Sequence, residues 1–147
     1  MPKPISISFV KTAKAKSDTV VLFADNSGKL LPSGVSLDKK SGGIISSALK
    51  VRDGFEGKHG DMLSVILPKG AGFDQALVIG LGRTEDLNGN SLENLGGKCV
   101  SALKSISAKS VQILIDMPKD STLSPEEFSA FLASGVRLKD YIFDKYK

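Results

Sequence analysis

The chain has 147 residues, of which 41% are hydrophobic and 24% are charged, a composition typical of one globular domain with a buried core. Its single cysteine excludes an internal disulfide, and no hydrophobic run approaches the roughly 20 residues that a transmembrane helix needs. The N-terminus leads into an alternating segment instead of the hydrophobic block of a signal peptide, so we expect a cytoplasmic protein.

The net charge of +4 arises in the first sixty residues. Residues 1–60 hold ten Lys and Arg against five Asp and Glu, whereas residues 61–147 hold ten against eleven. A basic segment can attract nucleic acid, and DNA binding is therefore one hypothesis for this part of the chain. The segment lacks the interleaved aromatic side chains of a single-strand binder, so an ordinary solvated surface is the favoured interpretation. The lysines that precede the first acidic residue are Lys3, Lys11, Lys14 and Lys16.

Two strands and a helix are predicted in the first third of the chain. Residues 5–9 alternate between hydrophobic residues and serines, which indicates a half-buried strand at a sheet edge. Residues 20–24 are continuously hydrophobic, which is typical of a more central strand. Residues 36–51 have helical spacing, but Gly42 and Gly43 lower the stability of such a helix by about 1 kcal/mol each. The glycine pair indicates either a close packing contact or a later helix start.

The remaining chain is predicted to supply three strands, at residues 62–67, 77–79 and 111–115, and two helices. The first helix begins near Asn90, which forms a capping-box-like pair with Glu93. The second begins at Ser124, with proline at its first helical position and Glu127 completing a capping box. The order of these elements predicts an α/β domain with a mixed sheet of about five or six strands flanked by helices.

The end of the chain carries no helix stop signal. After Gly135 neither a glycine cap nor a proline follows, and the aromatic residues of 141–147 have no later element to pack against. We therefore expect this sequence to continue in a longer protein.

A glycine pair after the strand at 77–79 invites comparison with a dinucleotide-binding turn. The fingerprint Gly-x-Gly-x-x-Gly requires a third glycine where Glu85 stands, and it requires a helix that starts at once. A plain turn at the strand end, made by Gly80 and Gly82, is the favoured interpretation.

No catalytic or metal-binding constellation is evident in the sequence. Cys99 lies on a hydrophobic helical stripe, which favours a buried thiol over a nucleophile, and His59 in a glycine-flanked turn is predicted to be a surface residue. Ser41–Ser47 offers hydroxyls without a general base. Four acidic residues have oxygens that suit a hard metal ion but match no known spacing, namely Asp116, Asp120, Glu126 and Glu127.

Several short stretches taken jointly resemble the N-terminal domain of the leucine aminopeptidase (cytosol aminopeptidase) family, bacterial type. They are 37–43 (LDKKSGG), 55–60 (FEGKHG), 76–83 (ALVIGLGR), 95–97 (LGG) and 141–147 (YIFDKYK). The last is similar to the segment that joins the two domains of bacterial members. The likeness extends over nearly the whole chain.

The resemblance implies a macro-domain-like fold for residues 1–140, with residues 141–147 starting the linker to a C-terminal catalytic domain. It implies a cytoplasmic, hexameric parent enzyme that releases N-terminal amino acids such as leucine from peptides. Two divalent metal ions, manganese or zinc, are expected in the catalytic domain. Because that domain lies outside residues 1–147, no catalytic, cofactor-binding or metal-binding residue is assigned in this chain. The implied role of the domain is to help hexamer assembly and access to the active site.

A second hypothesis follows from the macro-like fold alone, namely a module that binds ADP-ribose or a related nucleotide. A phosphate needs clustered backbone amides, and the candidates are Gly42-Gly43 and Gly80-Leu81-Gly82.

Overall fold

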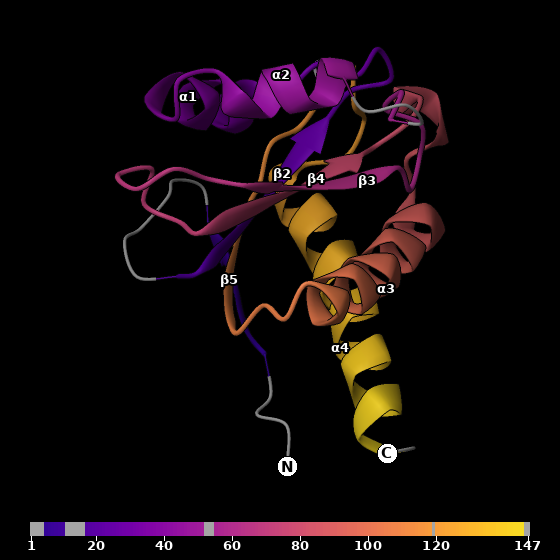
Figure 1. The fold of residues 1–147 in the computed structure, drawn as a ribbon. Helices are drawn as coiled ribbons and strands as arrows, with labels where there is room; N and C mark the ends of the chain where they lie inside the picture. Colours follow the sequence, from indigo (N-terminus) through magenta and orange to yellow (C-terminus); the bar gives the residue numbers. More distant parts are fainter. Residues whose placement is uncertain (1–4, 11–16, 52–54, 119, 146–147) are drawn as a thin grey trace.

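The computed structural model describes residues 5–10, 17–51, 55–118 and 120–145, with backbone only for 140–145. The elements in chain order (Figure 1) are β1 (Ser6–Val10), β2 (Thr19–Ala24), α1 (Pro32–Lys40), α2 (Ile44–Val51), β3 (Met62–Ile66), β4 (Gln75–Gly80), the 3-10 helix η1 (Thr84–Asp86), α3 (Gly89–Ser105), β5 (Ser110–Leu114) and α4 (Pro125–Lys145).

The strands form one five-stranded mixed sheet in the order β1-β5-β2-β4-β3. The pairs β1–β5, β5–β2 and β2–β4 are parallel, and β3 joins β4 antiparallel at the opposite edge. The prediction of a mixed sheet is confirmed, and so are the edge position of β1 and the central position of β2. The sheet is mixed because the loop at residues 67–74 joins β3 directly to β4 and reverses the chain, whereas helices lie between the two strands of each parallel pair in the chain.

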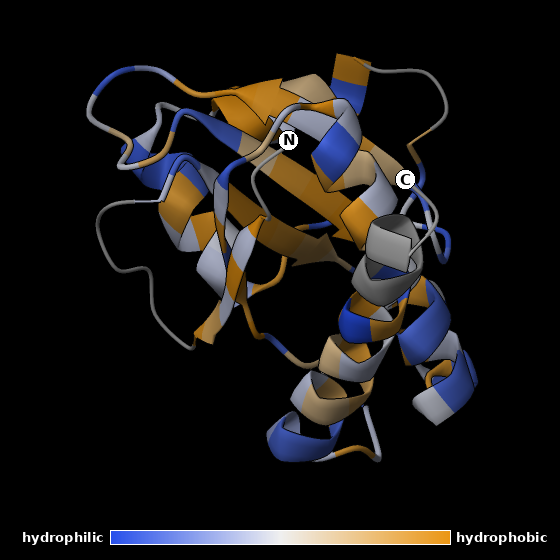
Figure 2. Cartoon of the chain, turned by 90° about the horizontal axis from the view of Figure 1, so that it is seen from below, coloured by the Kyte–Doolittle hydropathy of each residue, from blue (hydrophilic) through white to orange (hydrophobic). Residues whose placement is uncertain are grey.

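The sheet is covered by helices on both faces, with α1 and α2 on one side and α3 and α4 on the other (Figure 1). Alternate residues of β2 belong to different cores: Val21 and Phe23 pack with α3 and α4, whereas Val20 and Leu22 pack with Leu37 of α1 and Ile45 of α2. The central strands β2 and β4 accordingly carry continuous runs of hydrophobic residues, as Figure 2 shows. Phe23 also meets Phe128 of α4 edge to face, with ring centroids 5.5 Å apart.

The single helix predicted over residues 36–51 is wrong, because the structure has two shorter helices there. α1 begins earlier, at Pro32, whose fixed φ and missing N–H suit the first helical position. It ends before Gly42 and Gly43, which both adopt positive φ, at 76° and 80°. Neither position makes a close packing contact, since an added Cβ would meet nothing within 4 Å at Gly42. The glycine pair therefore serves as a chain reversal between two helices.

The start of α3 also differs from the prediction, whereas the start of α4 agrees with it. Asn88, not Asn90, is the N-cap of α3, and its side chain accepts a hydrogen bond from the Ser91 amide while the Ser91 hydroxyl accepts one from the Asn88 amide. Ser124 and Glu127 form the predicted capping box of α4, with both hydrogen bonds at 3.1 Å. α4 runs unbroken to Lys145, so the segment predicted to start a linker is helical that far; the boundary at residue 140 stays a prediction.

The helices α3 and α4 touch backbone to backbone at a pair of glycines. A Cβ added to Gly96 would overlap the Leu132 carbonyl oxygen and lie 2.9 Å from the Val136 amide nitrogen. A Cβ added to Gly135 would overlap the carbonyl oxygen of Glu93. Because real Cβ atoms do not approach other atoms so closely, this helix crossing requires glycine at both positions.

Candidate functional site

The loop at residues 55–61 is held rigidly against the end of β4. The Asp61 carboxylate accepts hydrogen bonds from the amides of Glu56 and Lys58, at 3.0 and 3.1 Å. A Cβ added to Gly80 would lie 2.7 Å from the carbonyl carbon of Gly57, and one added to Gly82 would lie 2.8 Å from the His59 amide nitrogen. The two glycines after the hydrophobic run of β4 therefore exist because this loop packs directly on them.

The same contacts leave the Gly80–Gly82 segment without free amides for a phosphate. The Gly80 amide donates to the carbonyl of Asp61 at 2.8 Å, and the Leu81 amide donates to Ala24 at 3.0 Å. The Gly82 amide donates to Gly57, also at 3.0 Å. Each donor that a phosphate would need already has a partner.

The second phosphate-loop candidate, Gly42-Gly43, is filled by a carboxylate of the chain itself. Asp38 Oδ1 accepts hydrogen bonds from the amides of Ile45 and Ser46, at 2.9 and 3.1 Å. The Gly43 amide donates to the Asp38 carbonyl at 2.8 Å. The N-terminus of α2 is thus capped internally, and its favourable partial positive charge already faces an acidic side chain.

The crevice at the carboxyl ends of β2 and β5 is where an open α/β sheet of this kind binds ligands, since the helices that follow these two strands cover opposite faces. Here Asp116, which follows β5, accepts hydrogen bonds from the Ser33 amide at 3.1 Å and the Ser33 hydroxyl at 3.0 Å. Ser33 lies in the first turn of α1, whose N-cap residue Leu31 supplies no side-chain hydrogen bond. Burial raises the pKa of Asp116, and the hydrogen bonds from Ser33 oppose that rise. The Asp116 carboxylate therefore lies at the helix N-terminus where a nucleotide-binding α/β fold holds the phosphate of its ligand.

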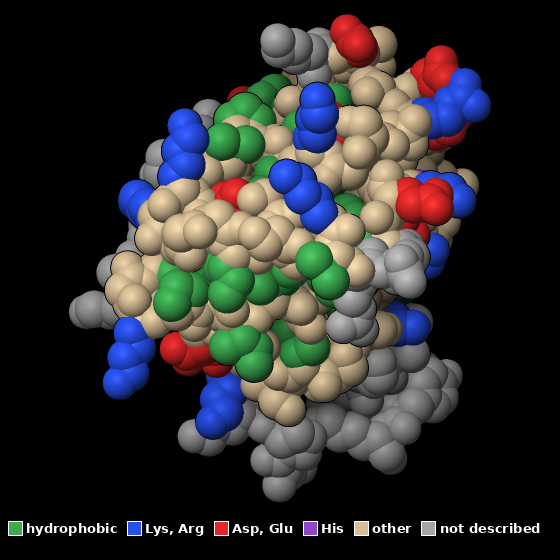
Figure 3. Space-filling model, turned by 45° about the horizontal axis from the view of Figure 1, so that its top comes forward, with side chains coloured by type: hydrophobic (Ala, Val, Ile, Leu, Met, Phe, Trp, Pro, Cys, Tyr) green, Lys and Arg blue, Asp and Glu red, His purple; other side chains and the backbone are tan. Residues whose placement is uncertain are grey.

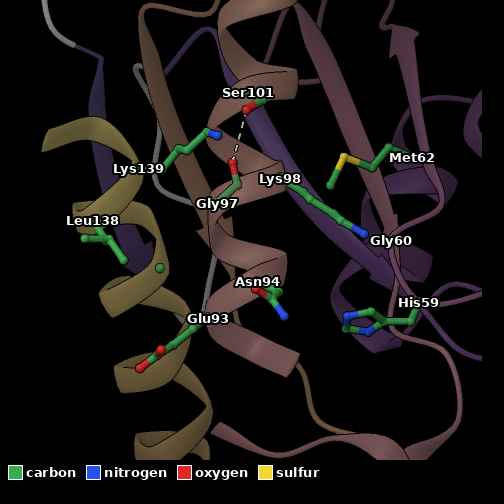
Figure 4. A pocket seen from close by; sticks show the side chains of 11 residues that line it. His59, Gly60, Met62, Glu93, Asn94, Gly97, Lys98, Ser101, Leu138 and Lys139 are labelled. Atoms are coloured by element: carbon green, nitrogen blue, oxygen red, sulfur yellow. Dashed lines mark hydrogen bonds between the residues drawn. The ribbon is translucent and has the colours of Figure 1, made fainter. Parts of the chain in front are cut away.

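A groove of about 690 Å³ lies between α3, the later half of α4 and the loop that carries His59 (Figure 4). The residues that line it include three glycines, Gly60, Gly97 and Gly135. The polar residues around it are His59, Glu93, Asn94, Lys98, Ser101 and Lys139, and Met62 and Leu138 add hydrophobic surface.

The side chains of His59 and Lys98 point into a common space in this groove (Figure 4). His59 Nδ1 lies 3.2 Å from the carbonyl oxygen of Leu81, and because a carbonyl only accepts, Nδ1 carries the proton and Nε2 is left for other partners. Lys98 Nζ lies 2.9 Å from the place where a Cβ of residue 60 would stand, so Gly60 makes room for the amine. The sequence predicted a surface residue at His59, and the structure has it half-buried at the edge of this groove.

Comparison with known proteins finds similarity over the whole chain. The model of the cytosol aminopeptidase family, N-terminal domain, matches residues 20–147. The chain belongs to the cytosol aminopeptidase family. It is 32% identical over 147 residues to a probable cytosol aminopeptidase of Nitrobacter winogradskyi and 32% identical over 150 residues to one of Rhodopseudomonas palustris. The chain spans 29% of the length of each of these two relatives.

Solved structures support the same family and the macro-like fold. A mutant of tomato leucine aminopeptidase has a TM-score of 0.70 and 26% identity, with 95% of this chain and 28% of that chain covered. The macrodomain of Mycobacterium tuberculosis DarG has a TM-score of 0.64 and 14% identity, with 92% and 93% covered. At that identity the second match shows the fold alone. The predicted macro-like α/β architecture of this cytosol aminopeptidase domain is thereby confirmed.

The candidate residues named from the sequence do not assemble into a reactive or metal-binding site in the described part of this family domain. Cys99 is fully buried, and its burial raises the pKa of the thiol to about 12, as predicted for a structural cysteine. Within the described residues no group of three or more His, Cys, Asp or Glu could hold a metal ion. Asp116 binds Ser33, and Glu127 caps α4, so two of the four acidic candidates have structural roles.

The lysine-rich segment cannot be placed in the same way. Lys3, Lys11, Lys14 and Lys16 lie outside the described residues. On the face shown in Figure 3, positive and negative side chains are interspersed with exposed hydrophobic ones.

In the described part of the chain, no helix is long and hydrophobic enough to span a bilayer.

The sequence analysis did not predict the contacts between residues that are far apart in the chain. The hydrogen bonds of Asp38 and Asp116 to helix N-termini were not predicted, because their partners lie seven and 83 residues away. The groove at His59 likewise combines residues from three separate segments. The glycines at 60, 96 and 135 were the available signal, since glycine inside a helix or beside a lysine invites the question of what approaches it.

Proposed function

We propose that these residues form the non-catalytic N-terminal domain of a cytoplasmic, metal-dependent leucyl aminopeptidase, an exopeptidase that releases N-terminal amino acids. The observation that carries the proposal is the family match over residues 20–147, joined with relatives of which the chain spans 29%. A catalytic domain then follows in the parent protein, and it holds the two divalent metal ions, manganese or zinc.

Within the parent, the proposed role of the domain is to help assemble the hexamer and to shape access to the active site. Two features support a role in contacts between domains. The later half of α4 extends away from the sheet (Figure 1). On it Leu138 has 60% of its surface exposed, a hydrophobic side chain suited to a further contact.

The proposal is tested by comparing this chain with the parent isolated from its source cell. The parent should hydrolyse leucine 4-nitroanilide and lose that activity on chelation of divalent metal ions. The 147-residue chain should hydrolyse none under the same conditions. Metal-dependent hydrolysis by the 147-residue chain alone would overturn the proposal.

The assembly role has its own test on the parent protein. Deletion of residues 1–140 should lower the hexamer fraction in light scattering and change the rates for long peptides more than those for a dipeptide. The parent carrying Asp120→Ala, a substitution of an exposed side chain, serves as the matched control. An unchanged hexamer fraction after the deletion would remove assembly from the proposed function.

The nucleotide-binding alternative gains no support from the geometry, because carbonyl and carboxylate oxygens of the chain itself already accept the hydrogen bonds of the amides in both glycine segments and in the crevice. Calorimetry with ADP-ribose should therefore show no more binding heat than calorimetry with the same concentration of inorganic phosphate. DNA binding through the lysine-rich segment stays a prediction. It predicts that the affinity for DNA falls steeply as the salt concentration rises, and that substitution of Lys11, Lys14 and Lys16 by alanine lowers it.

A further inference from the structure

We propose that the groove between α3, α4 and the His59 loop binds an oxyanion, a carboxylate or phosphate group, between Lys98 and His59. This inference goes beyond the proposed function and does not depend on a catalytic domain. It rests on the convergence of two nitrogen groups, on a loop that holds the histidine in place, and on the absence of a competing anion between the two groups among the residues that the structure describes.

Lys98 is available to a ligand. It projects from α3 over Gly60, and it makes no hydrogen bond or ion pair with another described residue. A lysine amine without a protein partner keeps all three donors for a ligand. The acidic residue of the groove, Glu93, points toward α4 and accepts a hydrogen bond from the Ser134 hydroxyl at 3.3 Å (Figure 4).

His59 adds a second donor with a fixed direction. Its Nδ1 is committed to the Leu81 carbonyl, so Nε2 becomes a donor when the imidazole takes up a second proton. The Gly82 contact with the His59 backbone and the Asp61 hydrogen bonds to Glu56 and Lys58 hold the loop still. A donor held in place by its loop loses little conformational entropy when a ligand binds.

The chemistry of the groove selects an oxyanion. A lysine ammonium and an imidazolium both donate charge-assisted hydrogen bonds, and a carboxylate or phosphate offers several acceptor oxygens to receive them. The Asn94 side chain lies beside this pair and can donate as well (Figure 4). The other charged groups around the histidine are Glu93 and Lys139 on the helices and Lys58, paired with Glu56, and Asp61 on the loop.

The test uses the ring protons of His59, which is the single histidine of the chain and therefore gives uniquely assigned NMR signals. Inorganic phosphate, sulfate and acetate are titrated at constant ionic strength, with chloride as the reference ion. We expect saturable shifts with dissociation constants of about 1–10 mM, the range for one small ion held by a few charge-assisted hydrogen bonds.

The matched variants are Lys98→Ala, which removes the amine, and Lys109→Ala, which removes an exposed lysine outside the groove. Lys98→Ala should weaken oxyanion binding at least about tenfold, whereas Lys109→Ala should leave it unchanged. Tighter binding of phosphate than acetate assigns a phosphoryl group as the ligand, and the reverse order assigns a carboxylate. Shifts that equal those with chloride, or that survive Lys98→Ala, would overturn the proposal.

Discussion

The two helical layers of this domain are held to the same sheet by different means. The α3–α4 layer is joined by close contact of two backbones at Gly96 and Gly135, above a large hydrophobic core. The α1–α2 layer consists of two short helices separated by a glycine reversal, and acidic side chains cap both of its helix N-termini. Asp116 reaches the first turn of α1, and Asp38 reaches that of α2.

The difference between the layers predicts which kind of substitution destabilises each one. A close backbone contact such as that between α3 and α4 is disrupted when a methyl group is added, and its stability does not depend on pH. A contact between a carboxylate and helix amides fails when the acceptor is removed, and it responds to protonation. The α3–α4 layer should therefore be sensitive to volume and the α1–α2 layer to charge.

The largest effect is expected from Gly135→Ala in the α3–α4 layer. The added methyl would overlap the Glu93 carbonyl oxygen, so the two helices must move apart and lose contacts along their length. We expect a loss of about 3 kcal/mol in the free energy of unfolding, measured by urea denaturation. A loss below about 1 kcal/mol would contradict the close contact that defines this layer.

The next effect is expected from Asp38→Ala in the α1–α2 layer. The amides of Ile45 and Ser46 lose their acceptor, so the N-terminus of α2 becomes uncapped. The free energy of unfolding should fall by about 1–2 kcal/mol, while the same change at the exposed Asp120 should leave it within about 0.5 kcal/mol. Equal effects at the two positions would show that the Asp38 cap does not stabilise the layer.

A smaller effect that depends on pH is expected from Asp116. Its pKa in the folded protein is raised above the ordinary value of 3.8, chiefly by burial, so the folded state holds this proton more tightly than the unfolded state does. The stability that protonation contributes is therefore complete below that ordinary value and is lost as the pH rises through the raised pKa. As the pH rises from below 3.8, the wild type should lose stability relative to Asp116→Asn until the carboxyl group is ionised in both the folded and the unfolded state.

Asp25 provides the comparison of opposite sign for that pH measurement. Burial alone would raise the pKa of Asp25, but hydrogen bonds from Ser27 and from the amide of Lys29 outweigh it, so the pKa is lowered. Stability from this group is present at higher pH and is lost as the pH falls through its lowered pKa. Paired urea titrations of Asp116→Asn and Asp25→Asn across the pH range should thus differ from wild type with opposite slopes. Parallel slopes would contradict the burial assigned to Asp116.

The smallest effect is expected from Gly97→Ala, next to the closely packed Gly96. A Cβ at residue 97 would meet Lys139 at an ordinary 3.8 Å, so nothing has to move. Alanine favours a helix interior over glycine, and the free energy of unfolding should rise by up to about 1 kcal/mol. A destabilisation like that of Gly135→Ala would mean that the two helices are closer at this level than the structure has them.

Sequence patterns predicted the sheet well because hydrophobic periodicity reports burial directly. The continuous hydrophobic run of β2 placed that strand at the centre of the sheet, and the alternation in β1 placed that strand at the edge. The local cap at Ser124 was also recognisable, since all of its partners lie within three residues. The helix start after Gly42-Gly43 was one of two alternatives, because a glycine pair has the same letters whether it packs closely or precedes a new helix.

The candidate site was less predictable for a physical reason. Lys98 and His59 are ordinary surface residues in the sequence, and only the packing of the 55–61 loop on Gly80 and Gly82 brings them into one groove. Asn88 outranked Asn90 as the cap of α3 because Ser91, three residues on from Asn88, completes the box. Such choices depend on three-dimensional partners that periodicity does not encode.

The most direct test of the central claim, that this is one domain of an aminopeptidase, is the intact mass of the native protein in its source cell. An antibody against residues 17–118 captures the protein, and mass spectrometry measures it. We predict a product of about three times the mass of the 147-residue chain, since the chain spans 29% of its relatives. A native product that ends at Lys147 would contradict the account and would make the chain a free-standing module.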